Sequence, residues 1–387
     1  MRPRIFRILM IGLGLALLAP GAPGFAQTPR HAPAAPVLGG DGWESVDPRR
    51  AGFDPDRLRA VLAKMVSGEV NLHAVIVERH GRLVAEAYRK GKDHPQFTLF
   101  SRTVDFDPAT RHDTRSVGKS VIGLLVGVAQ ARGQLGSLAT PVIDWFPESQ
   151  DLATPELRKV TLEHLLTMSS GLAWRESGVG FPNDEDRLAW KGSPTRFVLS
   201  RPAVAAPGTT FNYCSGGTVV LADILSRATR VPWPEFARSA LFQPLGITDY
   251  EWVTDLRGRP MPNSGLRLRP RDMAKLGRLV LNRGTWQGQQ LVPAAWIDAS
   301  RQSRLTTGFD GTGYGYHWWT GTVGWQGRTL PWCAAFGNGS QRIYTVPDLD
   351  LCVVTTAGAY GDLRTVRQVQ AYFQELVTTV VEGPATR

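Results

Sequence analysis

The chain has 387 residues, a formal net charge of +10, 42% hydrophobic residues and three cysteines. This length is enough for two lobes that share one interface, and no internal repeat is visible. The positive charge is scattered, with one short cluster at Arg267, Arg269 and Arg271, whereas nucleic-acid binding needs a continuous basic stripe. We therefore expect no nucleic-acid partner, and we interpret the charge as a solvated surface.

The N-terminal segment has the features of a secretory signal. Three arginines precede an apolar stretch over residues 8–18, and small residues lead to Ala26. The apolar stretch is too short to be a comfortable membrane span. We therefore predict a signal peptide over residues 1–26, a Pro- and Ala-rich disordered leader over 27–44, and a periplasmic or secreted protein without a stable membrane anchor.

Residues 45–115 contain the first regular elements. The hydrophobic pattern predicts a helix over 54–66 and two strands over 73–78 and 83–89, joined by the turn at 80–82. A loop is expected over 90–113. It leads to a tetrapeptide that carries chemistry.

Ser116 and Lys119 stand at the start of an apolar run over residues 121–128. If Ser116 lies in the first turn of a helix, Lys119 at i+3 lies on the same face, so the hydroxyl and the amine meet. A serine hydroxyl needs a neighbour that takes its proton, and a lysine can do so if its pKa is lowered. The helix N-terminus favours negative charge at the hydroxyl. This pattern predicts a nucleophile with an adjacent base.

Residues 117–270 are helix-rich, and two segments in this region could reach the same site. Tyr213 and Ser215 lie on a loop before an apolar helix, so a phenol and a hydroxyl can share one cleft, and a phenol beside an ammonium ionises more readily. The loop over 174–190 mixes aromatic and acidic residues. It could cap the cleft through Trp174 and Glu176, or it could be an ordinary solvated loop whose tryptophans pack down.

Strand patterns return near the C-terminus. They cover residues 314–320, 329–336, 341–346 and 351–356, and a helix is expected over 364–381. Between two of these strands lies the segment Gly337, Asn338, Gly339 and Ser340, where glycines would let the backbone approach an acyl group and an N–H near Ser340 would be an oxyanion donor. An ordinary hairpin turn is the alternative. In the strand over 314–320, the even-numbered face is expected to meet the core, and His317 is a candidate pocket residue.

These elements predict an α+β fold. Two early strands and several late strands would form one antiparallel sheet flanked by helices, so its lobe is discontinuous over 45–115 and 275–387. The helical lobe over 116–274 is inserted between these parts. The active site is expected in the seam between the lobes.

The three motifs, in this order and spacing, resemble the serine β-lactamase and penicillin-binding-protein superfamily, in particular the class C β-lactamase-like branch with tyrosine in its second motif. Residues 162–172 resemble the "HLLTMSSGL" segment of that branch, residues 207–213 its "PG…F.Y" segment, and residues 241–246 its "LF.PLG" segment. The resemblance extends from about residue 45 to the C-terminus. It implies a β-lactamase/transpeptidase-like fold and a covalent acyl-serine mechanism.

Two departures from the family pattern bear on the substrate. True β-lactamases and D,D-peptidases usually carry Asn at the third place of the tyrosine motif and Lys or His at the start of the third motif, where this chain has Ser215 and Gly337. The missing cation removes the usual partner of a substrate carboxylate. The chain is most similar to 6-aminohexanoate-dimer hydrolases and esterase-like members, which implies hydrolysis of a small ester or linear amide.

Two other functions stay open. They are a D,D-peptidase or β-lactamase and a catalytically silent binding protein of the same fold. An α/β-hydrolase is not indicated, because the chain has no Gly-x-Ser-x-Gly elbow. Cys-x-x-Cys and His-Glu-x-x-His motifs are also missing, so we predict no metal site and no cofactor.

Cys333 and Cys352 lie in consecutive strands and could form a disulfide. The oligomeric state is left open.

Overall fold

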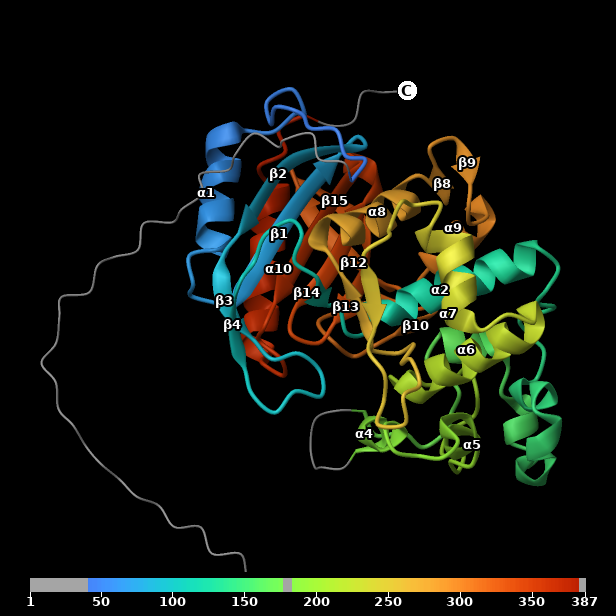
Figure 1. Ribbon diagram of the computed structural model, residues 1–387. Coiled ribbons are helices and arrows are strands. Elements are labelled where there is room, and N and C mark those ends of the chain that lie inside the picture. The colour runs from blue at the N-terminus through green and yellow to red at the C-terminus, as the bar shows by residue number, and fades with distance from the viewer. Residues whose placement is uncertain (1–40, 177–182, 383–387) are drawn as a thin grey trace, which may run out of the picture. The chain divides into compact units, whose positions relative to one another are not determined.

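The computed structural model describes residues 41–176 and 183–382, so the predicted signal peptide and most of the predicted leader lie outside the described residues. Among the described residues, no helix combines the length and the apolar character that a membrane span requires. The described part is an α+β fold with an antiparallel sheet and flanking helices, as expected (Figure 1).

The main sheet has eight strands in the order β10-β11-β12-β13-β14-β15-β1-β2. Their bounds are Leu305–Thr306, Gly313–Tyr314, Trp319–Trp325, Arg328–Gly337, Gln341–Val346, Leu351–Ala357, Leu72–Arg79 and Arg82–Tyr88. All neighbouring strands are antiparallel, and β15 joins the late strands to β1, with Val354 opposite both Ile343 and Ile76. This pairing confirms that the early and late strand segments form one sheet.

Helices cover both faces of the sheet. On one face lie α1 (Pro55–Met65) and α10 (Leu363–Val377), which contact each other and share a buried cluster with residues such as Val75 and Tyr344. On the other face α8 (Pro270–Leu281) packs on β14, β15 and β1. The predicted lobe boundary between residues 274 and 275 therefore falls within α8, and the division into two lobes stays a prediction.

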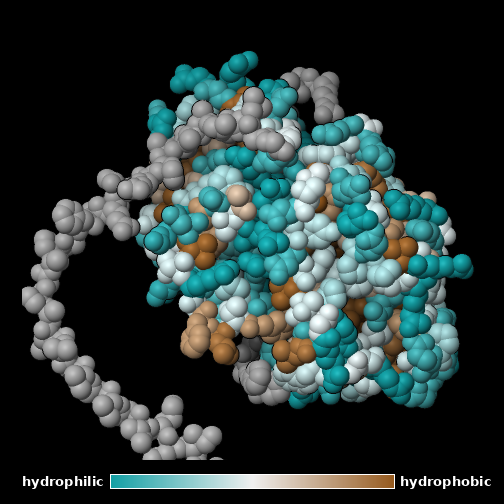
Figure 2. Space-filling model, in the orientation of Figure 1, coloured by the Kyte–Doolittle hydropathy of each residue, from teal (hydrophilic) through white to brown (hydrophobic). Residues whose placement is uncertain are grey.

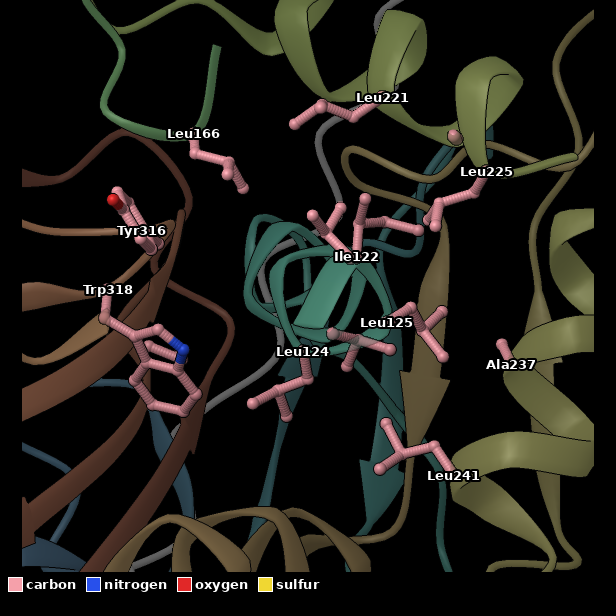
Figure 3. Close-up of a cluster of buried hydrophobic side chains, with 14 of the residues drawn as sticks. Ile122, Leu124, Leu125, Leu166, Leu221, Leu225, Ala237, Leu241, Tyr316 and Trp318 are labelled. Atoms are coloured by element: carbon pink, nitrogen blue, oxygen red, sulfur yellow. The ribbon is translucent and has the colours of Figure 1, made fainter. Parts of the chain in front are cut away.

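Helix α2 (Val117–Ala131) is the centre of the larger hydrophobic cluster, and all but its last two residues are buried. Figure 3 shows Ile122, Leu124 and Leu125 radiating from this helix, with Leu166 and Leu221 facing it from neighbouring elements. A helix that is apolar all round must be enclosed on all sides. The enclosing structure therefore holds the N-terminus of α2, where Ser116 lies, in one position.

The remaining helical elements include α6, which packs on α2. They are the α-helices α3 (Leu162–Leu166), α4 (Asp184–Leu188), α5 (Pro194–Leu199), α6 (Ser215–Thr229), α7 (Trp233–Ala237) and α9 (Ala294–Ser300), the single-turn or 3-10 segments η1 (Val142–Trp145), η2 (Pro147–Leu152), η3 (Leu157–Lys159) and η5 (Pro347–Leu349), and the π-type segment η4 (Arg238–Phe242). Several begin with side-chain caps. The side chain of Asn183, for example, accepts from the Asp186 backbone N–H at 2.9 Å.

Three smaller sheets were not predicted, two of them where the sequence indicated a loop or helices and one in a segment without a prediction. The expected loop over 90–113 contains β3 (Lys90–Asp93), β4 (Arg102–Asp105) and β5 (His112–Asp113). The helix-rich region contains β6 (Tyr250–Trp252) and β7 (Leu266–Leu268), which pair with β5, while β8 (Thr285–Trp286) pairs with β9 (Gln289–Gln290). Strands of two to four residues are too short to show a periodic pattern, and this is why they were missed.

The predicted strand over 314–320 is interrupted. Strand β11 ends at Tyr314 and β12 begins at Trp319, and His317 between them has φ +59°, which a strand cannot accommodate. The expectation for the even-numbered residues is nevertheless met, since Tyr314, Tyr316 and Trp318 are all buried.

The disulfide that the sequence left open is not formed, and Cys333 and Cys352 are both free and buried. Thr345 of β14 is opposite Cys333 on one side and opposite Cys352 on the other. A whole strand therefore separates the two cysteines, and two strand spacings amount to about 10 Å, beyond the roughly 7 Å limit between Cα atoms for a disulfide.

The face drawn in Figure 2 is mainly hydrophilic or mixed, with hydrophobic surface gathered in small groups, including one at its lower edge. The connection between β3 and β4 carries three exposed apolar side chains, Phe97, Leu99 and Phe100. Phe97 also lines the large cavity described below.

Candidate active site

The nucleophile candidate Ser116 is held at the N-cap of α2 by the segment that precedes it. Strand β5 pairs with β7, and the Thr114 N–H donates to the Leu266 carbonyl at 2.9 Å. Arg115 then adopts φ +52°, a left-handed conformation that is unfavourable for a residue with a side chain. This tight turn presents the half-buried Ser116 side chain to the cavity.

Lys119 lies one helical turn beyond Ser116, as the sequence predicted. Its Nζ donates to Ser116 Oγ at 2.8 Å and to the Asn263 carbonyl at 3.0 Å, and its side chain is buried. Burial alone would lower the pKa of Lys119, but the neighbouring Tyr213, Glu176 and Glu185 outweigh burial and raise it. The resting site therefore holds an ammonium, which differs from the lowered pKa that the sequence suggested.

Tyr213 joins the same network from the loop before α6. Lys119 Nζ lies 4.9 Å from the centre of its ring, and the side chains of Ser116 and Lys119 both act to lower the pKa of its hydroxyl. Burial raises the pKa of Tyr213 and exceeds the opposing effect of the ammonium. Lys119 does lower the pKa of Tyr213, as expected, but the net shift is upward, so the resting phenol is neutral.

An acidic pair lies behind the tyrosine motif. Glu176 accepts from the Ser215 backbone N–H at 3.0 Å and from its hydroxyl, while Glu185 Oε1 lies 3.2 Å from the same hydroxyl. Burial and the proximity of Glu185 raise the pKa of Glu176 to about 7. Ser215 therefore connects the carboxyl groups of Glu176 and Glu185 to the tyrosine motif.

Two further predicted residues have positions behind the cavity lining. Trp174 is buried and donates its Nε1–H to Glu176 at 2.5 Å, so it orients that carboxyl group. His317 is buried, its Nε2 lies 3.2 Å from Thr218 Oγ1, and burial together with Lys119 lowers its pKa to about 3. Neither residue is among those that line the cavity, whereas Glu176 is.

The third motif meets the cavity through its first residues. Gly337 and Asn338 line the cavity, while Gly339 and Ser340 turn away into the hairpin, with φ +85° and +68°. Ser340 is fully buried. An oxyanion donor is therefore better placed in the segment Gly337–Asn338 than at Ser340.

Sequence reasoning missed Asn263 and Arg342. Asn263 accepts from Lys119 through its carbonyl, and its Nδ2 donates to Glu185 at 3.3 Å. Arg342 lines the cavity, lies over the ring of Phe336 at 4.2 Å and donates to the Gly337 carbonyl at 2.8 Å. Its position in the sequence, close to the glycine motif, was the available signal.

The cavity over Ser116 has a volume of about 1170 Å³. Aromatic rings form one wall. The ring centre of Trp319 lies 5.8 Å from that of Tyr213 and 5.3 Å from that of Phe336, on which it stacks. The walls come from distant parts of the chain, and the lining residues include Phe97, Leu188, Trp233, Leu256, Phe309 and Leu363. The site can thus enclose an apolar group next to a nucleophile.

Comparison with known proteins places this geometry in context. A family model described as Beta-lactamase matches residues 59–368. The chain is 28% identical over 301 residues to the 6-aminohexanoate-dimer hydrolase of Paenarthrobacter ureafaciens, covering 73% of this chain and 71% of that protein. It is 32% identical over 231 residues to Esterase EstB of Burkholderia gladioli, covering 54% and 55%. A solved family VIII carboxylesterase matches with a TM-score of 0.64 at 15% identity, covering 83% and 97%.

Proposed function

The chain belongs to the Beta-lactamase family, and from that premise we propose that it hydrolyses a small ester or linear amide through a covalent acyl-Ser116 intermediate. The observation that carries the proposal is the 2.8 Å contact between Lys119 Nζ and Ser116 Oγ at the edge of a large cavity. The relatives named above include an amide hydrolase and an esterase, which supports this substrate class.

In the acylation step, Ser116 Oγ attacks the carbonyl carbon of the substrate. The Tyr213 phenol first loses its own proton to water, and because Lys119 already donates to Oγ, the serine proton then passes to the Tyr213 oxygen. The backbone N–H of Ser116 and an N–H of the Gly337–Asn338 segment stabilise the oxyanion. Tyr213 then protonates the leaving alcohol or amine, and the C–O or C–N bond breaks.

In the deacylation step, water attacks the acyl-Ser116 ester. Tyr213 takes a proton from the water, and the same oxyanion donors stabilise the second tetrahedral intermediate. Its collapse returns the proton to Ser116 Oγ and releases the acid. Lys119 remains charged throughout, and its role is to stabilise negative charge on the two oxygens that exchange the proton.

The lining suggests which substrates fit best. The wall of Trp319, Phe336 and Tyr213 suits an apolar or aromatic group. The half-buried Glu176, which lines the cavity with Glu185, suits a cationic or hydrogen-bond-donating end. An ester or amide with an apolar stem and a basic or donor group satisfies both surfaces.

A D,D-peptidase or β-lactamase activity is the second candidate, and Arg342 is the observation that favours it. These activities need a cation for a substrate carboxylate, and Arg342 brings a guanidinium to the cavity beside Gly337. The guanidinium is engaged by backbone carbonyls. We therefore rank this activity below ester or amide hydrolysis.

The test is intact-mass analysis of the protein after incubation with a fluorophosphonate, a short p-nitrophenyl ester and penicillin. Ser116→Ala should abolish labelling and reduce ester turnover by at least roughly a thousandfold. Ser120→Ala is the matched control, because Ser120 lies on the same helix and donates to the His317 carbonyl at 2.6 Å. Penicillin acylation would favour the second candidate, and no reaction with any reagent would favour a silent binding protein.

A further inference from the structure

Two histidines and an aspartate meet in the core away from Ser116. His73 lies on β1, Asp93 ends β3 and His112 begins β5, and all three side chains are buried. His73 Nδ1 lies 2.8 Å from His112 Nε2, and His112 Nε2 lies 3.9 Å from Asp93 Oδ1. The three ligand atoms lie within 4.8 Å of one another.

The outer ring nitrogens of both histidines face oxygen acceptors. His73 Nε2 lies 3.0 Å from the Lys92 carbonyl and 3.1 Å from Asn71 Oδ1. His112 Nδ1 lies 3.0 Å from the Asp113 carbonyl. A hydrogen on each outer nitrogen satisfies these acceptors. The amide of Asn71 is not free to rotate, because its Nδ2 donates to the Lys92 carbonyl at 2.6 Å.

With both outer nitrogens protonated, the two inner nitrogens face each other as bare lone pairs at 2.8 Å. Each of the three other neutral arrangements directs at least one lone pair at a carbonyl oxygen instead. Every neutral state of the pair thus contains at least one repulsive contact in a buried position, where such contacts are most costly. A positive charge between His73, His112 and Asp93 removes the conflict.

We propose that His73 Nδ1, His112 Nε2 and an Asp93 carboxylate oxygen bind a divalent transition-metal ion of the Zn²⁺ type. Two imidazoles and one carboxylate are a common ligand set for such ions. A proton shared between the two rings would form a hydrogen bond between the histidines only, because Asp93 lies 3.9 Å from His112, too far for a hydrogen bond. A metal ion would bind all three side chains. Burial lowers the pKa of both histidines, in keeping with binding as neutral ligands.

The surroundings of the cluster resemble the supporting shell of a metal site. Ligating histidines usually donate their other N–H to a carbonyl, and here a carbonyl oxygen lies 3.0 Å from the outer nitrogen of each ring. Ligating carboxylates are themselves hydrogen-bonded. Tyr360 donates to Asp93 Oδ1 at 2.9 Å, and Phe106 stacks on His73 at 4.0 Å. The supporting contacts are therefore in place, and the two ring nitrogens, now 2.8 Å apart, would move to about 3.3 Å to bind a tetrahedral ion.

The position of the site indicates that the ion would support catalysis indirectly, by stabilising the structure around Ser116. It joins β1 of the main sheet, the β3–β4 hairpin and β5, and His112 lies four residues before Ser116. The ion would fix the segment that presents the nucleophile. Sequence patterns did not predict it, because the three residues are about twenty positions apart and form no short motif.

The experiment uses the tag-free chain, with metal content measured by elemental analysis and Zn²⁺ and Co²⁺ titrated into the chelator-treated protein. We expect one ion per chain, visible Co²⁺ ligand-field bands, and a higher melting temperature with Zn²⁺. Asp93→Asn should weaken Zn²⁺ binding at least tenfold, and Tyr360→Phe, which keeps all ligands, should weaken it by about tenfold to a hundredfold.

Asp350→Asn is the matched control. It removes the carboxylate from another histidine–aspartate pair, in which His80 Nδ1 lies 2.9 Å from Asp350, and should leave Zn²⁺ affinity unchanged. The proposal is overturned if the folded wild-type chain binds neither ion, if Asp93→Asn and Tyr360→Phe both bind as the wild type does, or if nitrogen NMR shows a proton held between the rings in the presence of Zn²⁺. Tyr360→Phe keeps the test valid if Asp93→Asn does not fold.

Discussion

Lys119 Nζ donates to Ser116 Oγ at 2.8 Å and to the Asn263 carbonyl at 3.0 Å, so the ammonium is anchored on one side while it faces the nucleophile on the other. A raised pKa keeps it charged. Its contribution is therefore electrostatic, and proton transfer falls to Tyr213. This division of roles leads to separate predictions for the two residues.

Replacing Lys119 by Met should remove the charge and keep a long apolar side chain in the buried site. We expect turnover of a p-nitrophenyl ester to fall by at least about a hundredfold, because the oxygens that exchange the proton lose their stabilising cation. Steady-state kinetics measure this change, and circular dichroism checks the fold. Turnover within a fewfold of the wild type would contradict the role of Lys119.

Tyr213→Phe should remove the proton carrier and keep the ring. We expect kcat to fall by about a hundredfold to ten-thousandfold, the usual range for loss of a general acid–base group. Tyr314→Phe is the control, since Tyr314 packs against Tyr213 with ring centres 6.2 Å apart. Equal effects of the two substitutions would show that packing, and not proton transfer, is the contribution of Tyr213.

Glu176→Gln should change how stability depends on pH. Burial and Glu185 raise the pKa of Glu176 to about 7, above its ordinary value. The stability that this shift contributes is fully present below the ordinary pKa and is lost as pH rises through about 7. The wild type should therefore lose stability relative to Glu176→Gln between about pH 4.5 and pH 7, by at most about 3 kcal/mol.

Urea unfolding of both chains at pH 5 and pH 8 measures this difference. Because the titrating groups far from the site are common to the two chains, the change in their stability difference reports on Glu176 together with its neighbours Glu185 and Lys119. If that difference is the same at both pH values, the carboxyl group is not destabilised by burial.

Leu125→Ala should destabilise the helix that carries the nucleophile. Leu125 is fully buried in the cluster around α2 (Figure 3), and such a truncation costs about 2–5 kcal/mol. Val204→Ala is the control, since Val204 is 70% exposed and should change stability by less than about 0.5 kcal/mol. Denaturant unfolding distinguishes the two, and comparable losses would contradict the central position of α2.

Local patterns were sufficient for the long elements. The helix over 54–66 and the strand over 341–346 were predicted within one residue at each end, because caps and apolar periodicity act within a few residues. The short strands β5 and β7 were not predicted. Their pairing depends on residues about 150 positions apart, and this pairing places the segment before Ser116.

The sequence by itself determined that Ser116 and Lys119 share one helical face, since i and i+3 side chains meet in any α-helix. Only the tertiary structure decided the charge of that lysine, because Glu176, Glu185 and Tyr213 reach it from other segments. It also decided that Arg342 enters the cavity and that His73, Asp93 and His112 converge. Proton affinity and ligand binding depend on distances between segments, and no local pattern encodes those distances.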